Sequence, residues 1–177
     1  MNIPNILSLF RLALVPTFAV VFFSKLESAY VLAVVIYVVA FLTDILDGYI
    51  ARKYNLITKL GKILDPAADK LMNLTVLICF SIRNIIPWWA SAIILLKECT
   101  MAVGGIMMLR RLEDVQQANI FGKLATGVFF LISVILLLVD GISKDLATML
   151  ISIPITLAVV AMITYTITYV KAMKKVK

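Results

Sequence analysis

Residues 30–49 read YVLAVVIYVVAFLTDILDGY, an apolar run that ends with two aspartates, Asp44 and Asp47. A helix of roughly 20 mostly apolar residues is long enough to cross the hydrocarbon core of a bilayer. Because the lipid interior offers no water to backbone N–H and C=O groups, a run of this kind spans the bilayer as a helix. The stretch therefore predicts a membrane-spanning helix with carboxylates near one end.

Five further apolar runs lie along the chain, which predicts an all-α integral membrane protein with six transmembrane helices. The approximate spans are Ile6–Ser24, Tyr30–Tyr49, Ala67–Ile82, Trp88–Leu109, Lys123–Val139 and Leu146–Tyr169. Because the connections between them are short, we expect antiparallel neighbours in one bundle. We expect residues 1–177 to form a single membrane domain.

The composition excludes most other classes of protein. Of 177 residues, 63% are hydrophobic and 15% are charged, against about 45–50% and 25% in soluble domains. A soluble globule and a disordered chain are both incompatible with so much apolar surface. The chain has no histidine, which excludes His-based triads, imidazole acid–base chemistry and histidine zinc sites.

The basic residues predict the orientation in the membrane. If the N-terminus is cytoplasmic, eleven basic residues fall on the cytoplasmic side: Arg52, Lys53, Lys59, Lys62, Arg110, Arg111, Lys123, Lys171, Lys174, Lys175 and Lys177. Only Lys25, Arg83 and Lys144 fall on the other side. This positive-inside bias predicts a multi-pass protein of the cell membrane with both termini in the cytoplasm. It also accounts for the net charge of +7, so no nucleic-acid partner is expected.

Four aspartates gather at the predicted cytoplasmic ends of two adjacent helices. Asp44 and Asp47 are one turn apart and share a face. Asp65 precedes Pro66, which predicts an N-cap followed by proline at the first helical position, and Asp69 lies one turn later. Converging carboxylates repel one another unless a hard divalent cation binds them. The open alternative is a simple cap at Asp65 and ion pairs with Arg52, Lys62 or Lys70 for the others.

The spacing of these residues resembles a known signature. The pattern Asp44-x-x-Asp47-Gly48-x-x-Ala51-Arg52, then eight residues, then Gly61-x-x-x-Asp65-x-x-x-Asp69 is similar to that of the CDP-alcohol phosphatidyltransferase family. The start, Asn2-Ile3-Pro4-Asn5 with Ser8 and Arg11, resembles bacterial phosphatidylglycerophosphate synthases within that family. The resemblance implies transfer of a phosphatidyl group from CDP-diacylglycerol to an alcohol, with release of CMP, at the cytoplasmic interface of the bilayer.

The resemblance also implies roles for individual residues. Two divalent ions, Mg²⁺ or Mn²⁺, would be bound by Asp44, Asp47, Asp65 and Asp69, and Asp69 would also take the proton from the attacking hydroxyl. The donor CDP group would be bound by Gly48, Ala51, Arg52 and Gly61. Asn5 and Ser8 would contact the nucleotide, with polar packing against the motif as an equal alternative. A homodimer is implied as well.

The acceptor site departs from the synthase pattern. The candidate residues are Lys97, Lys123, Arg110 and Arg111, although a topology role is the stronger alternative for the two arginines. The stretches Lys97-Glu98, Gly104-Gly105 and Gly122-Lys123-Leu124-Ala125-Thr126 are less basic than the resemblance leads us to expect. We expect sn-glycerol 3-phosphate as the acceptor, with phosphatidylglycerol, and hence a cardiolipin synthase, as the alternative. A small cation or solute transporter is a remote alternative, because the acids cluster at one face and no inverted repeat is visible.

Overall fold

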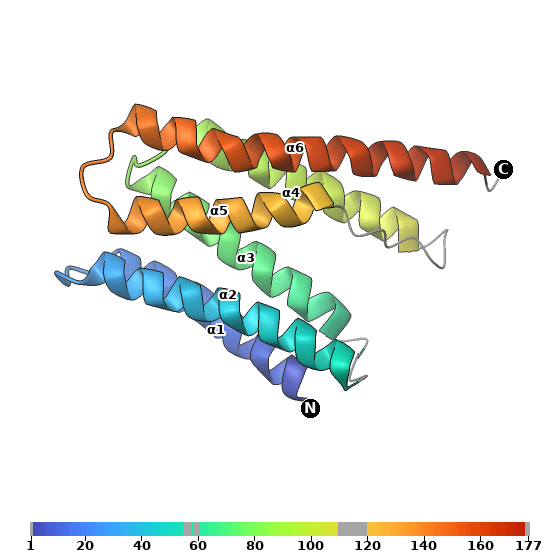
Figure 1. Cartoon of the computed structure of the whole chain (residues 1–177), viewed down its shortest axis with the longest axis horizontal. Helices are drawn as coiled ribbons and strands as arrows, with labels where there is room; N and C mark the ends of the chain where they lie inside the picture. Colours follow the sequence, from blue (N-terminus) through green and yellow to red (C-terminus); the bar gives the residue numbers. More distant parts are fainter. Residues whose placement is uncertain (1, 55–57, 59–60, 110–119, 176–177) are drawn as a thin grey trace. The chain divides into compact units, whose positions relative to one another are not determined.

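The computed structural model describes residues 2–54, 58, 61–109 and 120–175. Within these ranges every regular element is an α-helix, which confirms the predicted all-α class. The helices are α1 (Ile3–Phe22), α2 (Ala29–Lys53), α3 (Gly61–Ile82), α4 (Trp88–Leu109), α5 (Ile120–Leu138) and α6 (Lys144–Lys175) (Figure 1).

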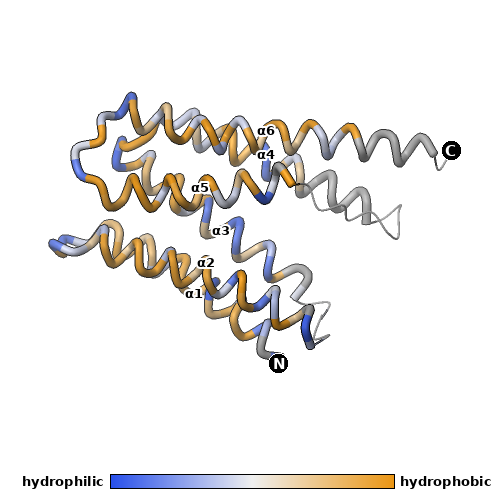
Figure 2. Tube along the Cα trace, viewed as in Figure 1, coloured by the Kyte–Doolittle hydropathy of each residue, from blue (hydrophilic) through white to orange (hydrophobic). Residues whose placement is uncertain are grey.

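Among the described residues, three helical segments are long and apolar enough to cross a membrane: Pro4–Phe22, Ala29–Ala51 and Lys144–Ile167. A shorter apolar helical segment covers Gly122–Leu138. Figure 2 shows hydrophobic residues along most of α1 and α2, whereas hydrophilic residues interrupt the first part of α3. These charged and polar positions include Asp65 and Asp69, so α3 is much less uniformly apolar than α2.

The beginning of α3 differs from the prediction. The helix begins at Gly61, so Asp65 is not its N-cap, and Pro66 lies inside the helix. The side-chain oxygen of Thr58 accepts a hydrogen bond from the backbone N–H of Gly61 at 2.9 Å, which satisfies one of the backbone donors left without a partner at a helix start. Pro66 removes one backbone hydrogen bond close to the helix start, where the loss is smaller than in the middle. The carboxylate of Asp65 is therefore available for contacts with other helices.

The described chain forms two compact units. The first comprises Met1–Arg83 with Leu137–Asp140, and the second comprises Asn84–Leu136 with Gly141–Lys177. In the second unit α4 packs against α6. In the first unit α1 packs against both α2 and α3, as Figure 1 shows.

Aromatic side chains form the centre of the first unit. The ring of Phe22 on α1 lies 6.1 Å from that of Phe80 on α3, and the ring of Phe18 lies 6.1 Å from that of Tyr37 on α2. Phe18, Phe22 and Phe80 are fully buried. This packing fixes the three helices against one another and so determines which polar residues meet nearer the N-terminal end of α1.

Candidate active site

One face of α1 brings three polar side chains into the first unit. Asn5, Ser8 and Arg11 follow one another at three-residue intervals, which places them on the same side of the helix. Their exposed fractions are 7%, 0% and 1%. Polar groups buried to this degree need hydrogen-bond partners, and α2 and α3 supply them.

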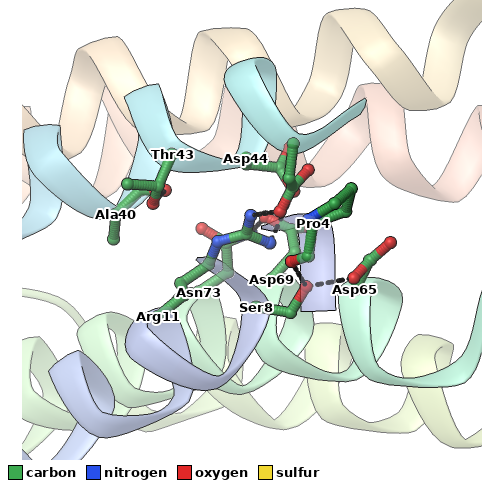
Figure 3. A network of polar contacts seen from close by, with 10 residues as sticks. Pro4, Ser8, Arg11, Ala40, Thr43, Asp44, Asp65, Asp69 and Asn73 are labelled. Atoms are coloured by element: carbon green, nitrogen blue, oxygen red, sulfur yellow. Dashed lines mark hydrogen bonds and ion pairs between the residues drawn. The ribbon is translucent and has the colours of Figure 1, made fainter. Parts of the chain in front are cut away.

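Arg11 binds two of the motif aspartates on α2. Its Nη1 donates to Oδ1 of Asp44 at 2.6 Å (Figure 3), and its Nη2 donates to Oδ2 of Asp47. The side chain of Asp44 remains 40% exposed, whereas that of Asp47 is only 3% exposed. The prediction that the two aspartates share one face of a helix is confirmed.

Sequence reasoning gave Arg11 no role in this site, although a signal was present. A lone arginine inside an apolar span costs about 2.5–3.5 kcal/mol on insertion scales, so it is expected to face a cavity or a partner. The acids that end the second apolar run are the natural partners. The alternative partners proposed for the aspartates were Arg52, Lys62 and Lys70; for Asp44 and Asp47 the observed partner is Arg11.

Asp65 joins the cluster through Ser8. The hydroxyl oxygen of Ser8 lies 2.9 Å from the carbonyl oxygen of Pro4 and within hydrogen-bond distance of Oδ1 of Asp65 (Figure 3). A hydroxyl has one hydrogen, so it donates to one of these oxygens at a time. The negative charge of Asp65 also acts on the carboxylates of Asp44 and Asp47.

Asp69 has a hydrogen-bonded support of its own. The side-chain amide of Asn73 donates to Oδ1 of Asp69 at 3.2 Å, and the hydroxyl of Tyr37 on α2 donates to the amide oxygen of Asn73 at 2.9 Å. Because the tyrosine can donate only to the oxygen of the amide, this arrangement turns the nitrogen toward Asp69. The sequence analysis included neither Tyr37 nor Asn73, although an asparagine one turn after a motif aspartate is a visible signal.

Asn5 and Gly61 meet at the start of α3. Thr58 donates from its hydroxyl to Oδ1 of Asn5 at 2.9 Å. A Cβ atom added at Gly61 would lie 2.9 Å from that same oxygen and 3.0 Å from the Thr58 hydroxyl oxygen. Gly61 therefore lies where a larger residue would collide with neighbouring protein side chains.

The chemistry of the donor set fits a hard divalent cation. Carboxylate oxygens are the ligands that Mg²⁺ prefers, and Arg11 engages only one oxygen of Asp44 and one of Asp47. Within the described residues, no three acidic or cysteine side chains converge closely enough to hold an ion. To bind an ion together, the carboxylates of Asp65 and Asp69 would have to approach the α2 pair more closely than they do here.

The remaining predicted donor residues lie on the last turns of α2. Gly48 and Ala51 are half-buried. The side chain of Arg52 lies outside the described part of the chain.

The predicted acceptor residues belong to the second unit or to the undescribed segment. Lys97 on α4 forms an ion pair with the adjacent Glu98 at 2.5 Å, and both side chains are mostly buried. Lys123 on α5 is exposed, whereas Ala125 is only 6% exposed. Arg110 and Arg111 lie outside the described residues.

Comparison with known proteins supports the family resemblance that the aspartate motif indicates. The family model for CDP-alcohol phosphatidyltransferase matches residues 1–171. The chain is 34% identical over 138 residues to CDP-diacylglycerol–glycerol-3-phosphate 3-phosphatidyltransferase of Bacillus subtilis, covering 71% of this chain and 70% of that protein. It is 38% identical over 130 residues to a probable phosphatidylglycerophosphate synthase of Mycobacterium tuberculosis, covering 72% and 61%.

A relative of a different name is equally similar. The cardiolipin synthase (CMP-forming) of Streptomyces coelicolor is 36% identical over 146 residues, covering 80% of this chain and 67% of that protein. The match to the family extends over nearly all of the chain, and it agrees with the aspartate motif on α2 and α3. The chain belongs to the CDP-alcohol phosphatidyltransferase family and is a transferase of phospholipid biosynthesis.

Proposed function

We propose that this enzyme transfers the phosphatidyl group of CDP-diacylglycerol to the hydroxyl of sn-glycerol 3-phosphate, giving phosphatidylglycerophosphate and CMP. The observation that carries the proposal is the gathering of Asp44, Asp47 and Asp65 around the buried face of α1. Carboxylates from two helices held in one place are suited to a cation that binds a pyrophosphate. Family membership supplies the reaction class.

The proposed cofactor is Mg²⁺ or Mn²⁺, as two ions bound by Asp44, Asp47, Asp65 and Asp69. When bound, the ions would offset charge on the donor pyrophosphate and on the leaving CMP. In the transfer, the acceptor oxygen bonds to the phosphorus that carries diacylglycerol, and the bond from that phosphorus to the CMP oxygen breaks. Asp69 takes the hydroxyl proton, with its Oδ1 held by Asn73.

The proposed donor site consists of Gly48, Ala51, Arg52 and Gly61. Arg52 would supply a charge-assisted contact to phosphate. Asn5 and Ser8 are engaged with Thr58 and Asp65, which supports the role of polar packing for both. A contact of either residue with the nucleotide would require these hydrogen bonds to be exchanged.

The proposed setting is the cell membrane, with six transmembrane helices in one bundle, a single domain, cytoplasmic termini and a homodimeric assembly. Three helical segments of sufficient length and apolarity support a membrane location. The excess of basic residues in alternate connections supports the orientation. Membership of a transferase family argues against the transporter alternative.

A second acceptor, phosphatidylglycerol, is favoured by one specific observation. A relative named as a cardiolipin synthase is as similar to this chain as those named as phosphatidylglycerophosphate synthases. The reduced number of basic residues near Lys97 and Lys123 is consistent with an acceptor that carries a single diester charge.

The decisive experiment supplies purified protein in detergent with CDP-diacylglycerol and Mg²⁺ or Mn²⁺. Glycerol 3-phosphate, phosphatidylglycerol, inositol phosphate and serine are offered in turn, and lipid products are identified by mass spectrometry. We expect phosphatidylglycerophosphate from glycerol 3-phosphate, loss of activity in excess EDTA and recovery on addition of the ion. Full activity in EDTA would contradict the metal requirement. Cardiolipin as the sole product would show that the acceptor is phosphatidylglycerol rather than glycerol 3-phosphate.

A further inference from the structure

We propose that Arg11 is a positioning residue, which holds one oxygen each of Asp44 and Asp47 so that the opposite oxygens are oriented toward a divalent cation. The inference rests on the proposed metal-dependent function and assigns a role within that site to a residue of α1. Its basis is an arginine that is 1% exposed and bonded to two aspartates of the motif.

The geometry of the contact fixes both carboxylates at once. Nη1 and Nη2 of one planar guanidinium bind Oδ1 of Asp44 and Oδ2 of Asp47, respectively. A guanidinium offers its donors in a rigid fork. The relative orientation of the two carboxylates is therefore set by the position of a single side chain. Mutation of side chains that orient metal ligands in this way typically lowers metal affinity by about 10–100-fold.

The charges favour the same role. Asp44, Asp47 and Asp65 lie close enough to repel one another, and arginine stays protonated in proteins. Arg11 thus offsets one negative charge of the cluster permanently. The net charge that remains is still negative, which leaves the carboxylates attractive to a cation.

Burial argues against release of Arg11 when an ion binds. In the described part of the chain the Nε atom of Arg11 has no hydrogen-bond partner, so the contacts of the guanidinium are those with the two aspartates. Moving it away would leave a buried charge without a partner, which is strongly unfavourable. Neighbouring positions of α1 are apolar, including Leu12 and Leu14. We therefore expect Arg11 to keep its contacts when the cation is bound.

The competing interpretation makes the opposite prediction. If Arg11 occupied the position of the cation and had to leave, removing it would tighten metal binding. If Arg11 orients the ligands, removing it weakens metal binding, because Asp44 and Asp47 become free to repel and turn apart. The sign of the change in Mn²⁺ affinity distinguishes the two.

The test measures Mn²⁺ binding to the full chain in detergent by electron paramagnetic resonance, together with phosphatidyl transfer. Arg11→Gln is expected to raise the Kd for Mn²⁺ by about 10–100-fold, and Arg11→Lys is expected to give an intermediate value, because it keeps the charge and loses the fork. The matched control is Arg83→Gln, an exposed arginine outside the cluster, which should leave the Kd unchanged.

Each outcome is decisive. An unchanged or lower Kd in Arg11→Gln overturns the inference, even if the wild-type enzyme transfers phosphatidyl groups normally. If Arg11→Gln does not fold by circular dichroism, Arg11→Lys carries the test, and an unchanged Kd in that variant overturns the inference. If the wild type does not bind Mn²⁺, both the inference and the proposed metal site are wrong. Mn²⁺ binding with the expected Arg11 effect, but no transfer to any alcohol, would instead overturn the proposed function alone.

Discussion

Asp47 is the most buried of the four motif aspartates, and it forms an ion pair with Arg11. Asp47→Asn keeps the shape of the side chain but removes a charged oxygen ligand and one of the two negative charges that pair with Arg11. We expect phosphatidyl transfer to fall on the order of 100-fold or more, comparable with the loss of a strongly coupled metal-site group. The measurement is CMP release at saturating donor across a Mn²⁺ titration.

Two controls make the Asp47 result interpretable. Removing one partner of a buried ion pair destabilises proteins by about 3–5 kcal/mol, so helix content and thermal unfolding are measured on the same sample. Asp145→Asn changes an exposed aspartate at the start of α6 and should leave transfer intact. Normal turnover by a folded Asp47→Asn enzyme would exclude Asp47 as a ligand.

Gly61 provides a test of close packing beside the motif. In Gly61→Ala the new methyl group would lie 2.9 Å from Oδ1 of Asn5 and 3.0 Å from the Thr58 hydroxyl oxygen. Because these two atoms are hydrogen-bonded to each other, the methyl group must displace that bond. We expect a stability loss of about 1 kcal/mol, the usual net value of a hydrogen bond, and reduced transfer.

The matched control for Gly61 is Gly127→Ala on α5, where an added Cβ meets no atom within 4 Å. Alanine is favoured over glycine in a helix by about 0.5–1 kcal/mol, so this variant should be as stable as the wild type or more so. Thermal unfolding of both variants in the same detergent compares them. Equal stability of the two variants would contradict the close approach at Gly61.

The arrangement of site residues could be predicted from the sequence where it depends on short spacings within one helix. A separation of three residues in a helix places Asp44 and Asp47 on one face, and both indeed bind Arg11. The prediction that Asp65 caps α3 was wrong, although an aspartate before a proline is a strong local cap signal. The structure instead begins α3 at Gly61, whose backbone N–H donates to Thr58, and Asp65 is a partner of Ser8. Contacts between helices decide this, and no local pattern contains them.

At the scale of helices, α2 and α3 are joined by a polar contact within an otherwise apolar unit. The hydroxyl of Tyr37 donates to Asn73, and Tyr37 is only 2% exposed. Side-chain hydrogen bonds between helices in membrane proteins average about 0.6 kcal/mol and reach about 1.7 kcal/mol. Tyr37→Phe should therefore lower the free energy of unfolding by about 1 kcal/mol.

The same variant should reduce phosphatidyl transfer several-fold, because the Asn73 amide loses the donor that fixes its orientation toward Asp69. Tyr30→Phe is the matched control: Tyr30 contacts the Phe22 ring, and its hydroxyl has no hydrogen bond within the described residues. Unfolding by SDS titration and initial rates are measured for both variants. A Tyr37→Phe enzyme with unaltered stability and rate would show that the contact contributes nothing.

The existence of the helices followed from hydrophobic runs, whereas only some of their ends did. Trp88–Leu109 was predicted with the same bounds that α4 has, and the predicted end of α3 at Ile82 also holds. The second helix extends beyond Tyr49 to Lys53. Gly48, Ala51 and Arg52 therefore lie on one continuous helix. Polar residues of the motif weaken the hydrophobic signal there, although backbone hydrogen bonding continues through them.

For the whole molecule, the charge distribution is the feature that relates membrane insertion to chemistry. Basic residues gather in alternate connections and at the C-terminus, and the acidic motif lies at the same predicted side. An anionic donor whose acyl chains remain in the bilayer must be met at such an interface. The proposed orientation and the proposed reaction therefore require the same side of the membrane.

We expect acceptor binding to depend on basic groups outside the first unit, and Lys123 is the most suitable of them to test by mutation. Lys123 is exposed, whereas Lys97→Ala would also remove the ion pair with Glu98. A charge-assisted hydrogen bond contributes about 1.5–3 kcal/mol, so Lys123→Ala should raise the KM for glycerol 3-phosphate by roughly 10–100-fold. The KM for CDP-diacylglycerol should change little, because the donor is assigned to α2 and α3.

Lys144→Ala supplies the control for Lys123, since Lys144 is an exposed lysine on the predicted opposite side. It should leave both KM values unchanged. Ala125→Lys is a poorer test, because Ala125 is 6% exposed and a lysine there would disturb packing before it met any substrate. If phosphatidylglycerol is the acceptor, it carries only a single diester charge and interacts less strongly with Lys123. In that case Lys123→Ala should lower kcat/KM by less than about tenfold. The contrary result is a wild-type enzyme that forms cardiolipin from phosphatidylglycerol and no phosphatidylglycerophosphate from glycerol 3-phosphate. That result would identify phosphatidylglycerol as the acceptor, and the role proposed for the aspartate cluster would stay the same.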